Sequence, residues 1–294
     1  MQGTGVAVVT PFTEEGTIAE ALLRKLVRWV EKRGVDFLVP CGSSGEAPLL
    51  CARDRLRVVE IVANEATIPV LAGTGYSRLS NVESQIDAMA ELDIDGALVL
   101  TPYFYNPDQS SIVSYFREVA DASPLPIYLY NVPIYTGIDL DPEVVQTLSE
   151  HERIEGIKDS NGNPSKIQRE RELVNDDFDL FVGGGDVYAL GLTAGADGGI
   201  SGLTNVVPEV MTAIFELVRD GNEREAVLLN RSLLDLNDEV LGRFGIAGVK
   251  TALETRGIET GWPLRPHDRI DEESKAEIRS LVTRAVSDVR NQPR

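Results

Sequence analysis

The chain has 294 residues, of which 43% are hydrophobic, and a formal net charge of −19 at pH 7. That charge disfavours nucleic acids and anionic membranes as partners, and its even spread along the chain is typical of proteins from salt-accumulating halophiles. With no apolar run near about 18 residues, no secretory signal pattern and only two cysteines, we expect a cytoplasmic globular protein without a disulfide framework. We interpret the source as haloarchaeal, with an acidic mesophilic protein as the alternative.

Short apolar or β-branched runs recur along the chain, and segments with helical periodicity separate them. The predicted strands span residues 6–10, 37–42, 69–73, 96–101, 126–131, 154–159, 180–185 and 198–203. The predicted helices between them span residues 18–32, 53–66, 81–92, 110–122, 142–149, 165–175 and 187–193. Near-continuous apolar strands that alternate with amphipathic helices indicate a parallel sheet covered on both faces. Because this βα unit occurs eight times, the sequence predicts an α/β fold, a (β/α)8 TIM barrel.

Further helical segments follow the eighth strand, at residues 207–219, 222–241, 245–256 and 271–290. We expect the first of them to complete the barrel and the others to form a C-terminal helical extension. The predicted division is therefore a catalytic barrel at residues 1–220 and an extension at residues 221–294.

The active site of such a barrel lies where the strands end and the following loops begin. At these positions the sequence places hydroxyls, glycines, one tyrosine and one lysine, namely Thr10, Ser43, Ser44, Thr74, Thr101, Tyr130, Lys158, Gly183 and Ser201. The set contains no pair of carboxylates, no histidine and no cluster of metal ligands. The residues therefore disfavour metal-dependent chemistry, and we expect no metal site.

Lys158 ends the run IEGIKD, where it is either paired with a carboxylate or used as a neutral amine. A lysine without histidine or metal suits a Schiff base, whose iminium accepts electrons while a carbon–carbon bond forms or breaks. Asp159 does not contradict this role, because adjacent residues of a strand point to opposite faces. Tyr130 ends the neighbouring strand, so its hydroxyl is a candidate proton shuttle, although tyrosines in strands are more often packing residues.

Two glycine-containing segments are candidate ligand sites. GSSGE, at residues 42–46, offers the hydroxyls of Ser43 and Ser44 and backbone N–H groups to a carboxylate or phosphate, or is simply a common turn. VGGGD, which contains Gly183, either lets a ligand approach the backbone closely or permits a tight turn. Neither segment is a dinucleotide fingerprint, so we expect no cofactor.

Taken together, the motifs resemble the pyruvate-dependent Schiff-base aldolase family of dihydrodipicolinate synthase, N-acetylneuraminate lyase and 2-keto-3-deoxygluconate aldolase. They run through almost the whole chain as VVTPFTEEGTI, GSSGEAPLL, AGTG, TPYFYNP, YLYNVPIYTG, GIKDSNG and GADGGISGLTNVVPE. The resemblance implies that Lys158 forms a Schiff base with pyruvate or another 2-keto acid and that Tyr130 relays protons. It further implies that Ser43 and Ser44 hold the carboxylate, that Ser43 joins the relay, and that Ile200 lines the pocket. A homotetramer is the oligomer that the resemblance implies.

The chain departs from the family pattern at two positions. Where dihydrodipicolinate synthases usually carry an arginine for the second substrate's carboxylate, soon after YNVP, this chain has Ile134 and Tyr135. Phe104 stands where the family tends to place a second tyrosine, and Tyr103 and Tyr105 flank it. Tyr135 as a substrate-binding residue suits a neutral, polyhydroxylated substrate, which needs hydroxyl partners rather than a cation.

We therefore predict a class I aldolase that cleaves 2-keto-3-deoxygluconate, or its 6-phosphate, to pyruvate and glyceraldehyde or its 3-phosphate. Such an enzyme fits an Entner–Doudoroff-type route and acts on small 2-keto acids and aldehydes. Dihydrodipicolinate synthase, N-acetylneuraminate lyase and a dehydratase of 2-keto-3-deoxy sugar acids are alternatives in the same family. A non-catalytic barrel that binds keto acids is the alternative from a different class.

Overall fold

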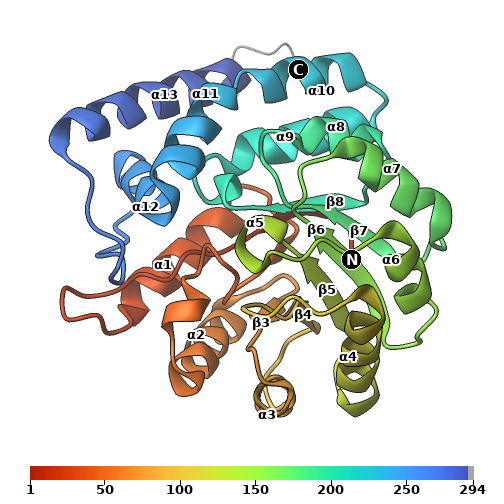
Figure 1. The fold of residues 1–294 in the computed structure, drawn as a ribbon. Helices are drawn as coiled ribbons and strands as arrows, with labels where there is room; N and C mark the ends of the chain where they lie inside the picture. Colours follow the sequence, from red (N-terminus) through yellow and green to blue (C-terminus); the bar gives the residue numbers. More distant parts are fainter. Residues whose placement is uncertain (291–294) are drawn as a thin grey trace.

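A computed structural model describes residues 1–290 and shows a closed barrel of parallel strands surrounded by helices (Figure 1). The strands are β1 (Gly3–Val6), β2 (Phe37–Leu38), β3 (Leu71–Thr74), β4 (Gly96–Leu100), β5 (Ile127–Asn131), β6 (Ile154–Asp159), β7 (Asp179–Val182) and β8 (Gly198–Ser201). Their order around the sheet is β2-β1-β8-β7-β6-β5-β4-β3. A parallel bridge between Leu38 and Val70 brings the two edge strands together. The predicted (β/α)8 TIM barrel is confirmed.

The helices of the barrel follow the strands in alternation. They are α1 (Glu20–Glu31), α2 (Ala52–Glu65), α3 (Leu79–Met89), α4 (Gln109–Ala122), α6 (Pro142–Ser149), α7 (Pro164–Leu173), α8 (Tyr188–Thr193) and α9 (Pro208–Arg219). Most of them bury an apolar stripe, as α1 does with Leu23, Leu26, Val27 and Val30, whereas α7 buries Ile167 and Glu170. Three short elements were not predicted: the 3₁₀ helices η1 (Ala47–Leu49) and η2 (Leu203–Asn205), and α5 (Pro133–Thr136) after β5.

The interior of the barrel is filled by large side chains, which leaves the carboxyl ends of the strands as the place for a site. Its buried cluster includes Phe37, Val39, Leu71, Leu98, Tyr128, Phe181 and Ile200. The rings of Phe37 and Phe181 lie 5.2 Å apart, centre to centre. Gly5 makes room for this pair, because a Cβ at that position would lie 2.4 Å from the Phe37 ring.

The first strand is three residues earlier than predicted. The apolar run 6–10 is buried, but only Val6 belongs to β1. After Val6, two backbone groups form hydrogen bonds with the side chain of Asn205. Val9 N–H donates to Asn205 Oδ1 at 3.1 Å, and Asn205 Nδ2 donates to the Ala7 carbonyl at 2.7 Å. A buried backbone group can be satisfied by a side chain as well as by a neighbouring strand. Burial of residues 6–10 therefore did not show where the strand ends.

The C-terminal segment forms α10 (Glu223–Arg231), α11 (Leu234–Asn237), the π-helix η3 (Asp238–Arg243), α12 (Gly245–Thr255) and α13 (Glu272–Arg290). The prediction of one helix over 222–241 is wrong. Buried Asn230 anchors α10, because its side chain accepts from Ala189 N–H and donates to the Gly185 carbonyl, both at 2.8 Å. The helix breaks just after this anchor, a tertiary contact that helical periodicity does not reveal.

The extension shares its hydrophobic core with the barrel. Ile278, Val282 and Ala285 of α13 belong to the same buried cluster as Val6 of β1 and Leu23 of α1. The division at residue 220 therefore stays a prediction, and residues 291–294 of the predicted extension lie outside the described residues.

Candidate active site

Lys158 and Tyr130 meet at the carboxyl end of the barrel. They are register partners on the neighbouring strands β6 and β5, and Lys158 Nζ lies 4.1 Å from the centre of the Tyr130 ring. Both side chains are buried. The half-buried Lys166 and the buried Lys250 are paired with carboxylates, whereas Lys158 has no ion pair among the described residues. An amine that faces an aromatic ring and lacks a carboxylate partner is free to act as a nucleophile.

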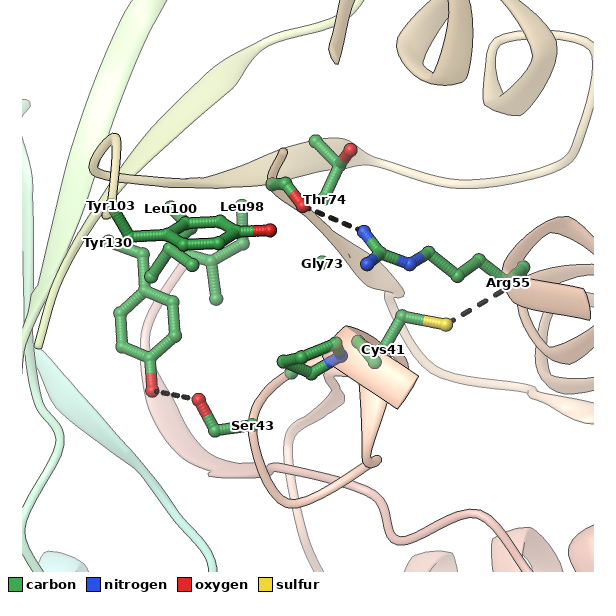
Figure 2. Close-up of a pocket in the computed structure, with 13 residues that line it drawn as sticks. Cys41, Ser43, Arg55, Gly73, Thr74, Leu98, Leu100, Tyr103 and Tyr130 are labelled. Carbon is green, nitrogen blue, oxygen red and sulfur yellow. Dashed lines mark hydrogen bonds between the residues drawn. The ribbon is translucent and has the colours of Figure 1, made fainter. Parts of the chain in front are cut away.

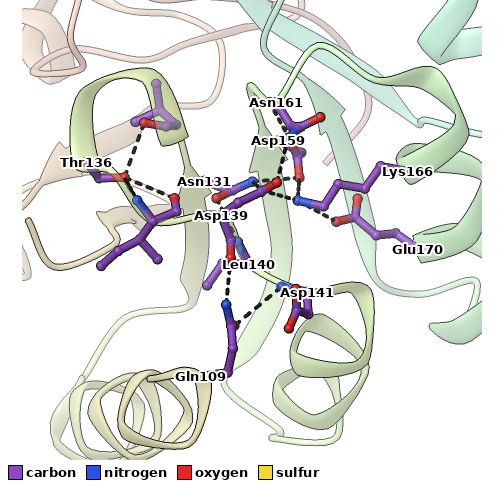
Figure 3. A network of polar contacts seen from close by, with 12 residues as sticks. Gln109, Asn131, Thr136, Asp139, Leu140, Asp141, Asp159, Asn161, Lys166 and Glu170 are labelled. Atoms are coloured by element: carbon purple, nitrogen blue, oxygen red, sulfur yellow. Dashed lines mark hydrogen bonds and ion pairs between the residues drawn. The ribbon is translucent and has the colours of Figure 1, made fainter. Parts of the chain in front are cut away.

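Asp159 belongs to a polar network with Asn131, Asn161 and Lys166 (Figure 3). Its Oδ2 accepts from Asn131 Nδ2 at 2.9 Å and lies 2.7 Å from Lys166 Nζ. Its Oδ1 accepts from the Asn161 N–H at 2.6 Å. Lys166 Nζ also contacts Asp139 at 2.6 Å. The network therefore supports the ends of β5 and β6 from the side opposite Lys158.

Glu170 is the most deeply buried carboxyl group of this network, with no exposed surface. Burial, followed by the nearby charge of Asp159, raises the pKa of Glu170 to about 9. These two effects outweigh Lys166, whose Nζ lies 3.8 Å from Glu170 Oε1 and lowers the pKa. For Lys166, burial lowers the pKa, but Asp159 and Glu170 outweigh it and the net pKa is raised. Lys166 thus stays charged at the centre of the network, and the pKa of Glu170 is shifted upward by its burial.

Tyr130 connects Lys158 with the serine loop. Its hydroxyl lies 3.2 Å from Ser43 Oγ, and either oxygen can be the donor. Burial raises the pKa of Tyr130, but the charge of Lys158 and hydrogen bonds to Ser43, Lys158 and Ser160 outweigh it, so that the pKa is lowered. A phenol with a lowered pKa, bonded to a serine and adjacent to an amine, is suited to proton relay.

The serine loop after β2 is held by the C-terminal extension. Ser43 and Ser44 are half-buried, and Glu46, which follows them, has a left-handed backbone with φ of 58°. Glu46 Oε1 lies 2.5 Å from Lys250 Nζ of α12, and Glu46 Oε2 accepts from Leu264 N–H at 2.7 Å. Sequence reasoning missed this pair, because its members are far apart in the chain.

The remaining predicted site residues occupy different surroundings. Ile200 of β8 is fully buried in the barrel interior, in the same cluster as Tyr130. A Cβ at Gly183 would lie 1.7 Å from Ser160 Oγ, so this glycine is required for the packing of Ser160. Tyr135 of α5 is 70% exposed and lies outside the cavity described next, and Phe104 is 84% exposed.

A cavity of about 360 Å³, measured out to its open mouth, adjoins Tyr130 and Ser43 (Figure 2). Its wall also includes Cys41, Arg55, Thr74, Leu98, Leu100 and Tyr103. Tyr103, rather than Phe104, is the aromatic residue of its loop that lines this cavity. Arg55 and Thr74 complete the wall opposite Tyr130, and the side chain of Arg55 had no signal in the sequence beyond its place on a predicted helix.

Residues 1–285 match the family model described as the dihydrodipicolinate synthetase family. The chain belongs to this family. It is 35% identical over 285 residues to 4-hydroxy-tetrahydrodipicolinate synthase of Methanothrix thermoacetophila, and the match covers 96% of each chain.

Two solved structures are similar over almost their whole length. One is YagE of E. coli K12, a prophage protein of the dihydrodipicolinic acid synthase family, in complex with pyruvate. It has a TM-score of 0.92 and 28% identity, and covers 97% of this chain and 99% of its own. The other, the chloride-inhibited dihydrodipicolinate synthase of Acinetobacter baumannii with pyruvate, has a TM-score of 0.92, 30% identity and the same coverage.

Membership of the family makes the chain a Schiff-base-forming, pyruvate-dependent lyase that acts on small keto acids. Members of the family are typically oligomeric. Across the described residues no helix has both the length and the apolar character that a membrane span requires.

Proposed function

We propose that this enzyme condenses pyruvate with an aldehyde through a Schiff base on Lys158, with the activity of a 4-hydroxy-tetrahydrodipicolinate synthase. One observation carries the proposal: Lys158, without an ion pair among the described residues, faces Tyr130, and Tyr130 contacts Ser43. The same set also provides for the proton transfers that the reaction needs.

In the proposed reaction, the neutral Lys158 amine attacks the ketone carbon of pyruvate, and loss of water gives an iminium ion. Removal of a methyl proton then converts the iminium to an enamine, which attacks the aldehyde carbon. Tyr130 and Ser43 move protons between the adduct and the aldol oxygen. Ser43, Ser44 and the backbone N–H groups of their loop hold the pyruvate carboxylate. The amine that the acceptor carries then attacks the final iminium carbon, which closes the nitrogen ring of the product and releases Lys158 as the free amine.

The proposed acceptor follows from the product named for the relatives. Tetrahydrodipicolinate is a nitrogen ring with two carboxylates, and pyruvate supplies only one of them. The acceptor must therefore bring the second carboxylate and the amine, as aspartate 4-semialdehyde does. Curated relatives at 31–35% identity carry the synthase name, which favours this reaction over the cleavage of 2-keto-3-deoxygluconate.

Aldol cleavage of 2-keto-3-deoxygluconate is the second candidate, because Tyr135 stands where synthases usually carry an arginine. The same lysine chemistry would then run toward pyruvate and glyceraldehyde. The haloarchaeal source, the Entner–Doudoroff route and the phosphorylated substrate belong to this candidate and stay predictions. N-acetylneuraminate lyase stays an alternative without a structural observation of its own.

Borohydride trapping tests the lysine, and product analysis tests the acceptor. Wild type, Lys158→Ala and the exposed-lysine control Lys25→Ala are incubated with pyruvate and borohydride, then digested for peptide mass spectrometry. We expect a reduced pyruvate adduct on Lys158 in wild type and the control, and none in Lys158→Ala. A folded wild type without an adduct contradicts the proposal. Consumption of pyruvate with aspartate 4-semialdehyde, compared with release of pyruvate from 2-keto-3-deoxygluconate, then decides between the candidates.

We further propose a homotetramer in the cytoplasm. Large hydrophobic side chains are exposed on loops and short helices that follow the strands, namely Leu49, Phe104, Tyr105, Ile134 and Tyr135. Exposed aromatic and aliphatic groups of this kind are typical of protein interfaces. Light scattering after size-exclusion chromatography measures the oligomer directly, and a monomer at micromolar concentration would contradict the proposal.

A further inference from the structure

We propose that Arg55 binds the anionic group of the acceptor aldehyde and thereby determines which acceptors the enzyme uses. This inference rests on the proposed condensation and adds the chemical class of the acceptor, an aldehyde that carries a carboxylate or a phosphate.

Arg55 lies in the wall of the cavity that Tyr130 and Ser43 also line. It comes from α2 and is 3% exposed. Figure 2 shows its guanidinium on the side of the cavity opposite Tyr130 and Ser43. An acceptor whose aldehyde approaches Tyr130 would therefore extend its far end toward Arg55.

The guanidinium is only partly satisfied by the protein. Nη1 donates to the Gly75 carbonyl at 2.8 Å, and the guanidinium carbon lies 4.1 Å from the centre of the Tyr76 ring. Nε is buried without a hydrogen-bond partner. No carboxylate of the described residues forms an ion pair with Arg55, although the buried Lys250 and the half-buried Lys166 both have one. A buried cation without an anion is unfavourable, so the site is suited to a ligand that supplies the negative charge.

The neighbouring groups fit the same ligand. The hydroxyl of Thr74 is buried, has no hydrogen-bond partner and belongs to the cavity wall. A guanidinium fork and a hydroxyl together match the oxygens of a carboxylate or phosphate. Arg55 therefore offers, from a different element, the cation that the segment around Tyr135 lacks.

The test compares a charged and an uncharged acceptor. Wild type, Arg55→Met, Arg55→Lys and Arg57→Met are assayed with pyruvate and either aspartate 4-semialdehyde or butanal. Arg57 is the matched control, because it lies on the same helix and pairs with Glu20 and Glu60 outside the cavity. For Arg55→Met we expect the ratio of kcat/KM between the two aldehydes to fall roughly 10- to 100-fold, which corresponds to one lost charge-assisted hydrogen bond. Arg55→Lys should recover part of the ratio, and Arg57→Met should leave it unchanged.

An equal decrease of kcat/KM with both aldehydes in Arg55→Met would overturn the inference and leave Arg55 as a support for Gly75 and Tyr76. If Arg55→Met does not fold, the same comparison is made with Arg55→Lys. A failure of the proposed function has a different signature, since wild type would then trap pyruvate but not consume aspartate 4-semialdehyde. In that case the same variants are assayed for cleavage of 2-keto-3-deoxygluconate and of its 6-phosphate instead of for condensation. Loss of a preference for the phosphate in Arg55→Met would support the inference, and an unaltered preference would contradict it.

Discussion

Lys158 and Tyr130 are register partners on β6 and β5, and the residues that follow them, Asp159 and Asn131, are partners too. Because side chains alternate along a strand, the first pair faces the interior of the barrel and the second faces outward. Asn131 Nδ2 donates to Asp159 Oδ2 at 2.9 Å. The same two strand ends therefore carry Lys158 and Tyr130 on one face and the hydrogen-bonded pair of Asn131 and Asp159 on the other.

Tyr130→Phe tests the proton relay. We expect kcat to fall roughly 100- to 1,000-fold, because a positioned acid or base contributes this much to proton transfer. Borohydride trapping of pyruvate on Lys158 should persist, since the amine itself remains. Steady-state rates and the trapped fraction measure the two effects separately, and a variant with the kcat of wild type would show that Tyr130 only packs.

The two serines are predicted to differ. Ser43 contacts the Tyr130 hydroxyl at 3.2 Å, whereas Ser44 has no described contact with Tyr130. Ser43→Ala should therefore lower kcat and raise the KM for pyruvate, while Ser44→Ala should mainly raise KM. Each effect on KM is expected to be on the order of 10-fold, the value of about one hydrogen bond to a charged group. Identical kinetic changes in both variants would remove Ser43 from the relay.

The ion pair between Glu46 and Lys250 tests the link between the serine loop and the extension. Both side chains are buried, and Lys250 Nζ also donates to the Trp262 carbonyl at 2.8 Å. Glu46→Gln or Lys250→Met alone should lower the free energy of unfolding by about 3–5 kcal/mol, because the other charge stays buried and unpaired. The double variant should lose less free energy of unfolding than the sum of the losses in the two single variants.

Urea denaturation of the four proteins closes this double-mutant cycle. Additive losses would show that the two charges do not interact. The KM for pyruvate of the more stable single variant supplies a second readout, which should rise if the pair positions the serine loop.

Glu170 is predicted to make stability depend on pH. Its pKa is raised from 4.5 to about 9 in the native state, so unfolding above pH 4.5 releases a proton. The contribution of Glu170 to the free energy of unfolding is therefore fully present below pH 4.5 and declines as the pH rises toward 9. Between pH 4.5 and 9 the free energy of unfolding should fall less steeply with pH in Glu170→Gln than in wild type. The difference between the two slopes should be up to about 1.4 kcal/mol per pH unit.

The exposed neighbour Glu172 provides the control, because its side chain is 72% exposed on the same helix. Glu172→Gln should keep the pH dependence of wild type. Parallel curves for wild type and Glu170→Gln would contradict the raised pKa of Glu170.

Much of the candidate site could be predicted because its residues lie within local patterns. Lys158, Tyr130 and the two serines stand at the ends of short apolar runs, and the alternation of strands and helices places such ends at one mouth. Alternation also predicted that Asp159 points away from Lys158, and its contacts with Lys166 agree with this. Residues 6–10 and 222–241 were assigned wrongly because contacts with distant residues decide the backbone there. Asn205 bonds the first segment, and Asn230 of the second segment bonds Ala189 and Gly185.

The sequence by itself determined the barrel, its family and the lysine and tyrosine at its mouth, since periodicity and motifs are properties of neighbouring residues. Only the tertiary structure decided what surrounds them. The pairing of Glu46 with Lys250, the buried carboxyl of Glu170 and the guanidinium of Arg55 in the cavity join segments far apart in the chain. Their burial and charge depend on which elements pack together, and no pattern within a single segment encodes that.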